Sequence, residues 1–180
     1  MNSNLTIRPV LNTEAKLLSA LAKEIYIPHY PYLWEPGGVE WYINEFAYTV
    51  EKIQLELNDE NNLHFIAWLN EEPVGYLKVN INTKTKGYDS IDVMELERIY
   101  LYQNSIQKGL GKQLMQFVIS LAKEYDKKIL VLKAMDSATQ ALQFYQKFGF
   151  KIAHAFRLPA TTFHLMKKEY RGMLVLELHL

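Results

Sequence analysis

The chain of 180 residues contains no cysteine. Disulfide bridges and thiolate metal sites are therefore excluded. The chain also lacks an excess of either charge, because 20 basic residues balance 20 acidic ones. Proteins whose main task is to bind nucleic acid usually carry a basic excess, so we expect no nucleic-acid partner.

Long apolar runs are missing as well. The first ten residues, MNSNLTIRPV, lack the apolar core of a signal peptide. No stretch approaches the roughly 20 apolar residues that a membrane-spanning helix needs. The sequence therefore predicts a cytoplasmic protein with no membrane partner. Its length and its apolar content of 49% suit a single folded domain over residues 1–180.

Two periodicities predict the order of the secondary-structure elements. Alternating apolar residues indicate strands, and apolar residues that recur every three or four positions indicate helices. We expect strands at residues 4–10, 63–69, 74–81, 93–101, 128–135, just after 150 and at 173–180, and helices at residues 13–27, 39–53, 110–124 and 137–150. The order β-α-α-β-β-β-α-β-α-β-β describes an α+β domain built on a mixed sheet.

The stretch SIQKGLGKQL, residues 105–114, joins a predicted strand to a predicted helix. It is not a P-loop, because Ile106 and Gln113 occupy positions that need Gly and Ser or Thr. It also lacks the third glycine of the dinucleotide fingerprint. Even so, the unpaired N–H groups of a helix start bind anions, and Gly109 and Gly111 permit close backbone approach. A plain turn explains the two glycines equally well.

A second motif, ALQFYQKFGF at residues 141–150, lies one strand downstream. Together with ELERIYL at residues 95–101 and QKGLGKQL at residues 107–114, it resembles the Gcn5-related N-acetyltransferase (GNAT) superfamily. Within that superfamily, ELERIYL is most similar to the PaiA-like spermidine/spermine acetyltransferases. The resemblance covers residues 74–150 and implies a mostly antiparallel sheet, flanked by helices, whose two central parallel strands splay apart.

The resemblance also implies acetyl-CoA as the cofactor. Backbone groups of the central strand would pair with the pantetheine arm, and N–H groups of the loop would bind the pyrophosphate. The implied cofactor-binding residues are Ile99, Tyr100, Leu101, Gln107, Lys108, Gly109, Leu110, Gly111, Lys112, Ser137 and Tyr145. Two positions depart from the family pattern: Ile106 replaces Gln or Arg, and Ala138 replaces a frequent Asn.

Family members transfer the acetyl group to an amine by direct attack in a ternary complex. Glu97 is the implied general base, and Glu95 is second because simple alternation places it on the same face. Ion pairing with Arg98 or nearby lysines is the alternative for both acids. Tyr145 is the implied general acid that protonates the departing thiolate, and a packing role in the core is its alternative.

The acceptor is expected to be a small-molecule or peptide amine. Aromatic residues crowd the connection between the first two helices, and such a wall suits a cation, although packing onto the core explains it too. Trp34 and Glu35 are the candidate substrate-binding residues.

The five histidines show no metal-ligand spacing, so no metal is expected. A catalytically silent acyl-CoA-binding module is the rival function, for which Ile106 and Ala138 give a motive. Dimers are common in the family, which makes a homodimer one expected assembly.

Overall fold

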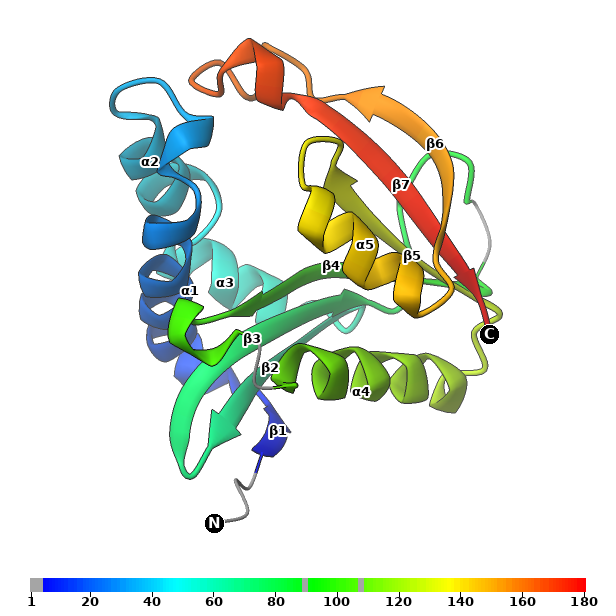
Figure 1. The fold of residues 1–180 in the computed structure, drawn as a ribbon. Coiled ribbons are helices and arrows are strands. Elements are labelled where there is room, and N and C mark those ends of the chain that lie inside the picture. Colours follow the sequence, from blue (N-terminus) through cyan, green and yellow to red (C-terminus); the bar gives the residue numbers. More distant parts are fainter. Residues whose placement is uncertain (1–4, 89–90, 107–108) are drawn as a thin grey trace.

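The computed structural model describes residues 5–88, 91–106 and 109–180. Its strands form a seven-stranded sheet in the order β1-β2-β3-β4-β5-β7-β6 (Figure 1). The pair β4–β5 is parallel, and the other five pairs are antiparallel. The strands are β1 (Leu5–Pro9), β2 (Asn62–Leu69), β3 (Glu72–Asn80), β4 (Val93–Leu101), β5 (Ile129–Met135), β6 (Lys151–Arg157) and β7 (Gly172–His179). The predicted α+β fold with a mixed sheet is confirmed.

Helices cover both faces of the sheet (Figure 1). One apolar cluster joins the sheet to α4 and α5, and a second, rich in tyrosine, joins the opposite face to α1, α2 and α3. The α-helices are α1 (Ala15–His29), α2 (Gly38–Trp41), α3 (Val50–Leu57), α4 (Leu110–Glu124) and α5 (Thr139–Lys147). The shorter turns are η1 (Asn12–Glu14), η2 (Pro31–Leu33), the π-helical η3 (Tyr42–Phe46), η4 (Gln103–Ser105) and η5 (Lys168–Tyr170). No helix within the described ranges has the length and apolar character needed to cross a membrane.

The second predicted helix is corrected by the structure. The sequence predicts one helix over residues 39–53, but the chain breaks between η3 and α3. Thr49 has an extended backbone there, and its side chain accepts a hydrogen bond from the Lys52 N–H at 3.1 Å. Such a cap stabilises a new helix start, so the apolar periodicity continues through two helices instead of one.

The strands expected at residues 63–69 and 74–81 are present as the hairpin β2–β3, with a tighter turn than their spacing predicts. The sequence places the turn at residues 70–73, whereas the strands end at Leu69 and resume at Glu72. Asn70 and Glu71 have φ values of 51° and 67°. Two left-handed residues in succession match the right-handed twist of paired strands.

The parallel pair β4–β5 separates halfway along its length. Its register runs from Val93 opposite Ile129 to Leu96 opposite Leu132 and stops there. Beyond that point, residues 98–101 of β4 pair with β3, and residues 133–135 of β5 pair with β7. The side of β4 that faces β5 therefore carries backbone N–H and C=O groups without a strand partner. The family resemblance predicted this splay.

A β-bulge lies where the two strands part. Lys78 of β3 stands opposite Arg98 and Val79 stands opposite Leu96, which leaves Glu97 as the extra residue of β4. Bulges bend a strand and re-aim its side chains, and they are frequent beside active sites. Glu97 therefore sits at the mouth of the opening between β4 and β5.

The loop between β6 and β7, residues 158–171, closes onto the connection between α1 and α2 at the top of Figure 1. The Glu35 N–H donates to the Leu165 carbonyl at 2.9 Å, and the Lys167 N–H donates to the Leu33 carbonyl at 2.9 Å. We call this contact the clasp. It joins segments from the two ends of the chain on the face that carries α1 to α3.

Candidate active site

The start of α4 lies beside the open end of β4. Gly109 is the N-terminal cap, with a left-handed φ of 75°, and Leu110 anchors the helix in the core with 2% of its surface exposed. The N–H groups of the first turn are directed away from the helix at the positive end of its dipole, and this arrangement binds anions. Lys112 is exposed on the same turn. The predicted Gln107 and Lys108 lie outside the described residues.

The two glycines of this loop are expected to respond differently to alanine. Gly109→Ala should lower the free energy of unfolding by about 1 kcal/mol, because a left-handed φ disfavours a Cβ. A Cβ on Gly111 would meet Phe144 at an ordinary 3.6 Å, and alanine favours helices. Gly111→Ala should therefore keep or raise stability, yet weaken binding of the acetyl-CoA that the resemblance implies by about tenfold, if that ligand approaches the backbone closely. Urea unfolding and calorimetry measure the two effects, and unchanged affinity in Gly111→Ala would contradict the close approach.

The predicted strand residues lie at the opening. Ile99 and Leu101 pack against the cluster of α4 and α5, while Tyr100 stacks on Tyr76 on the other face with ring centroids 5.4 Å apart. Their backbone groups pair with β3 on one side only. Gly75 permits that pairing, because a Cβ there would lie 2.4 Å from the Tyr100 carbonyl oxygen.

Tyr145 reaches the opening from α5. Its ring lies at centroid distances of 5.5 Å from Phe144 and 6.0 Å from Phe150. Burial raises the pKa of Tyr145 to about 12. Its hydroxyl has no hydrogen-bond partner within the described ranges. It lies close enough to Tyr30, at the end of α1, to contribute to the raised pKa of that residue, after burial. The Tyr145 side chain therefore keeps its proton at neutral pH and has a donor available.

Glu97 lies at the bulge where the opening begins, and its carboxylate is held by cations and by Asn80 of β3. Its carboxylate lies 2.8 Å from Lys78 Nζ and 3.4 Å from Arg98 Nη2, and it accepts a hydrogen bond from Asn80 at 2.9 Å. Its side chain is 31% exposed. Burial alone would raise the pKa of Glu97, but Arg98 and Lys78 outweigh it and lower the pKa below its usual value. The ion pairing that the sequence left open is present, and Glu97 is charged at neutral pH.

Glu95 lies on the same face, as alternation predicted, because Asn80 Nδ2 also donates to it at 3.4 Å. Its carboxylate is 2.9 Å from Lys133 Nζ and accepts a hydrogen bond from Thr83 at 2.8 Å. Only 4% of Glu95 is exposed. Glu97 is therefore the more accessible of the two acids.

A buried ion pair between Lys78 and Glu56 holds Lys78 beside Glu97, and the sequence analysis did not predict it. Lys78 Nζ lies 2.9 Å from Glu56, whose other oxygen faces Arg98 at 3.5 Å and His64 Nε2 at 3.3 Å. Burial opposes ionisation of Glu56, but His64, Arg98 and Lys78 lower its pKa to about 2. The available signal was Lys78 itself, a charge in the middle of the apolar run VGYLKVNI.

The two residues predicted to bind the acceptor differ in their exposure to solvent. Trp34 is 4% exposed, and its indole N–H donates to the Tyr26 hydroxyl at 3.0 Å, so it supports the wall from within. Glu35 has an exposed side chain, while its backbone N–H belongs to the clasp. Ser137 is also exposed, in the turn between β5 and α5.

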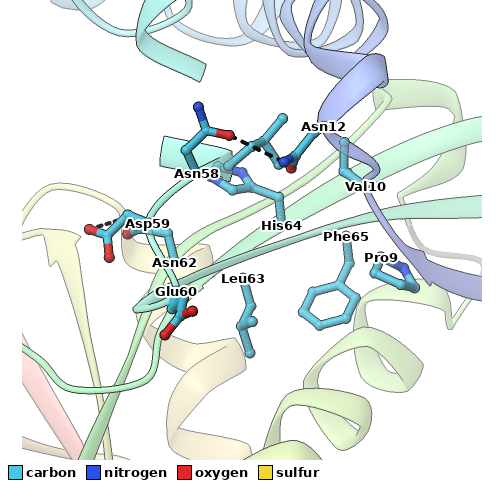
Figure 2. Close-up of a pocket in the computed structure, with 11 residues that line it drawn as sticks. Pro9, Val10, Asn12, Asn58, Asp59, Glu60, Asn62, Leu63, His64 and Phe65 are labelled. Atoms are coloured by element: carbon cyan, nitrogen blue, oxygen red, sulfur yellow. Dashed lines mark hydrogen bonds between the residues drawn. The ribbon is translucent and has the colours of Figure 1, made fainter. Parts of the chain in front are cut away.

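A separate hollow of about 400 Å³ is lined by the end of β1, the residues that follow α3 and the start of β2 (Figure 2). His64 points from β2 toward α3, whereas Leu63 and Phe65 point toward α4 (Figure 2). The hollow borders the start of β2. Asn62 at that start pairs with Asn80 of β3, and Asn80 pairs with Glu95 of β4, so the hollow lies beside the Glu95 end of β4 and far from Leu101. It is therefore distinct from the opening. Across the described ranges, no three potential His, Asp or Glu ligands gather to hold a metal ion.

These features define a class of protein. A sheet opened between two parallel strands, an anion-binding helix start at the opening and a protonated tyrosine beside it suit the binding of acetyl-CoA and the release of its thiol. The sequence model of the acetyltransferase (GNAT) family matches residues 22–150, and the chain belongs to this family. The cosubstrate of the family is acetyl-CoA.

Several known proteins are similar to the chain. It is 28% identical over 99 residues to an uncharacterized N-acetyltransferase in the pepI 3' region of Lactobacillus delbrueckii subsp. lactis, a match over 55% of this chain and 57% of that relative. The chain thus spans little more than half the length of this curated relative.

Solved structures share the fold over nearly the whole chain. The PaiA N-acetyltransferase of Thermoplasma acidophilum in complex with coenzyme A has a TM-score of 0.76 at 19% identity, covering 98% of this chain and 99% of that one. A ribosomal-protein-alanine N-acetyltransferase of Brucella melitensis has a TM-score of 0.71 at 17% identity, covering 97% and 99%. A GNAT family acetyltransferase of Elizabethkingia anophelis with acetyl-CoA bound has a TM-score of 0.65 at 21% identity, covering 98% and 99%.

Proposed function

We propose that this chain transfers the acetyl group of acetyl-CoA to a primary amine by direct attack in a ternary complex. The observation that carries the proposal is the opening between β4 and β5, which begins where the register stops at Leu96 and Leu132. The charged Glu97 and the protonated Tyr145 both border it. The chain has no cysteine to form a thioester with the acetyl group, which supports direct attack.

The residues present fit acetyl-CoA. Residues 99–101 would pair with the pantetheine arm through their open backbone side, and Ser137 stands at the end of β5. N–H groups of residues 109–112 would bind the pyrophosphate, which needs no particular side chain at Ile106. When bound, acetyl-CoA supplies the activated acetyl group.

The amine must lose a proton before it attacks. An alkylamine with a pKa of about 10.4 is neutral in about one molecule per thousand near pH 7.4, a deficit of about 4 kcal/mol. A positioned base contributes about 10²–10⁴-fold. Because Lys78 and Arg98 lower the pKa of Glu97, we assign it the role of orienting a water through which the ammonium proton passes to bulk solvent.

The departing sulfur must be stabilised as negative charge develops on it. Tyr145 is placed to do this from α5, because its proton is retained and no described residue accepts it. Its pKa of about 12 exceeds that of an ordinary thiol, about 8.5, by about 3.5 units. Full proton transfer to the thiolate is therefore uphill, and a hydrogen bond from the Tyr145 hydroxyl to the sulfur is the effective contribution.

The acceptor would bind on the face that carries α1 to α3. Glu35 is exposed at the clasp, where a carboxylate attracts a cationic amine, and Trp34 holds the wall behind it. The acceptor class is a small-molecule or peptide amine.

Release of CoA from acetyl-CoA, measured against a panel of amines and peptides, tests the proposal. We expect turnover with at least one amine class and calorimetric binding of acetyl-CoA without any amine. Binding without turnover on every amine would favour the silent acyl-CoA-binding module. Absence of acetyl-CoA binding would contradict the roles proposed for the opening and for the start of α4.

A further inference from the structure

Three partly exposed apolar side chains form a row across the sheet beside the opening. Met135 of β5 stands opposite Met173 of β7, and Phe156 of β6 stands opposite Met173 on its other side. Residues opposite one another in a sheet share a face. This row is on the same face as Lys133, which pairs with Glu95, and Met135 packs against the cluster of α1 to α3. The row therefore belongs to the acceptor side.

The neighbouring side of the opening is aromatic. Tyr30, just after α1, and Tyr100 of β4 meet edge to face with ring centroids 5.8 Å apart. Burial and then the nearby Tyr145 raise the pKa of Tyr30, so its hydroxyl is neutral at physiological pH. An acceptor that reaches Tyr145 from this face thus lies between aromatic rings and the row of Met135, Met173 and Phe156.

The carboxylates that the described strands place on this face of the sheet already have partners. Glu95 pairs with Lys133 at 2.9 Å, and Glu97 pairs with Lys78 at 2.8 Å. Glu177 accepts a hydrogen bond of 2.5 Å from Tyr88 and lies 3.3 Å from His179. Glu97 alone combines a position at the opening with partial exposure. Among the described strand residues of this face, Glu97 is thus the one carboxylate offered to the reacting amine, and no second one lies along the row. Glu35 lies outside the sheet, at the clasp.

We infer that the acceptor carries a single ammonium group on an apolar body and that polyamines are poor acceptors. The inference rests on the proposed function and departs from the polyamines that the likeness of ELERIYL implies. An apolar body gains by covering the row. A second ammonium group placed there would lose water without finding a carboxylate, which is costly.

Pentylamine and cadaverine form a matched pair, because cadaverine is the same carbon chain with an ammonium group at both ends. Binding of each to the enzyme–CoA complex is measured by calorimetry, and kcat/KM by CoA release. We expect pentylamine to bind at least about tenfold more tightly, the discrimination typical of one mismatched group in an apolar pocket, with a similar ratio in kcat/KM. Equal or tighter binding of cadaverine, or binding of neither amine, would overturn the inference.

Substitutions at the centre of the row sharpen the test. Met173→Glu should reduce or reverse the preference by supplying the missing carboxylate, whereas Met173→Leu, which keeps the surface apolar, should preserve it. A preference that Met173→Glu leaves intact would overturn the role of the row. The wild-type comparison stands whether or not Met173→Glu folds.

This experiment tests acetyl transfer and the preference for a single ammonium group independently of each other. Pentylamine that binds preferentially but releases no CoA would count against acetyl transfer and would support the binding preference. Rapid CoA release with cadaverine and slow release with pentylamine would support acetyl transfer and overturn the inference.

Discussion

Replacing Tyr145 with phenylalanine is expected to lower kcat by about 10²-fold or more, the range for one lost hydrogen-bond donor to a developing negative charge, with no change in the Kd of acetyl-CoA. The ring packs between Phe144 and Phe150, and this packing survives the substitution. The hydroxyl alone is removed, and with it the hydrogen bond to the departing sulfur. Steady-state kinetics and calorimetry measure the two quantities.

Tyr125→Phe is the matched control, because Tyr125 is exposed at the far end of α4. It should behave as wild type. The pH profile provides a second check. Protonated Tyr145 is the active form, so its contribution is present below its pKa of about 12 and is lost only as pH rises through that value. A decline in kcat near pH 9 that disappears in Tyr145→Phe would contradict this, as would full activity of the variant.

Glu56→Gln is expected to lower the free energy of unfolding at pH 7 by about 3 kcal/mol, as for one partner removed from a buried ion pair. Lys78 has 5% of its side chain exposed and would keep Glu97 as its one acidic partner. Arg98, 10% exposed, would lose a partner as well. Urea unfolding at equal protein concentration measures the difference between the two proteins.

The difference should depend on pH in a defined direction. The pKa of Glu56 is about 2 in the folded protein, against 4.5 for the free group. Its stabilising contribution is therefore complete above about pH 5 and is lost as pH falls through about 2. The stability curves of wild type and Glu56→Gln should converge on acidification. Glu60→Gln, an exposed change just past α3, is the control and should follow wild type at every pH; a gap that stays constant to pH 2 would refute the assignment.

Local patterns predicted much of the scaffold. The bounds of β4 and α4 follow from apolar periodicity, and the structure has them where the sequence placed them. The break before α3 escaped this reasoning because the apolar spacing continues across it, and the deciding contact is a side-chain cap at Thr49. Periodicity reports which face is apolar, and it is insensitive to a change of helix axis.

Some residues of the candidate site could likewise be predicted from local motifs, and others could not. The glycines at 109 and 111 and the tyrosine at 145 are visible as motifs, because the backbone or one side chain carries the role. The burial of Trp34 and the pairing of Lys78 with Glu56 depend on segments that meet only in the folded chain, so residue type alone could not assign them. The row of Met135, Met173 and Phe156 depends on the register between strands, and this register cannot be predicted from the sequence of each strand alone.

The bulge at Glu97 reverses which residues of β4, the even-numbered or the odd-numbered, face each side of the sheet. Up to Leu96, even-numbered residues of β4 face α4 and α5; beyond the bulge the odd-numbered residues Ile99 and Leu101 do so, while Tyr100 takes the acceptor side. Because side chains alternate with a period of two, deleting one residue here would exchange the two sets. Tyrosine would then enter the apolar layer, and isoleucine and leucine would face the acceptor. One unpaired residue thus decides to which side of the sheet the rest of β4 belongs.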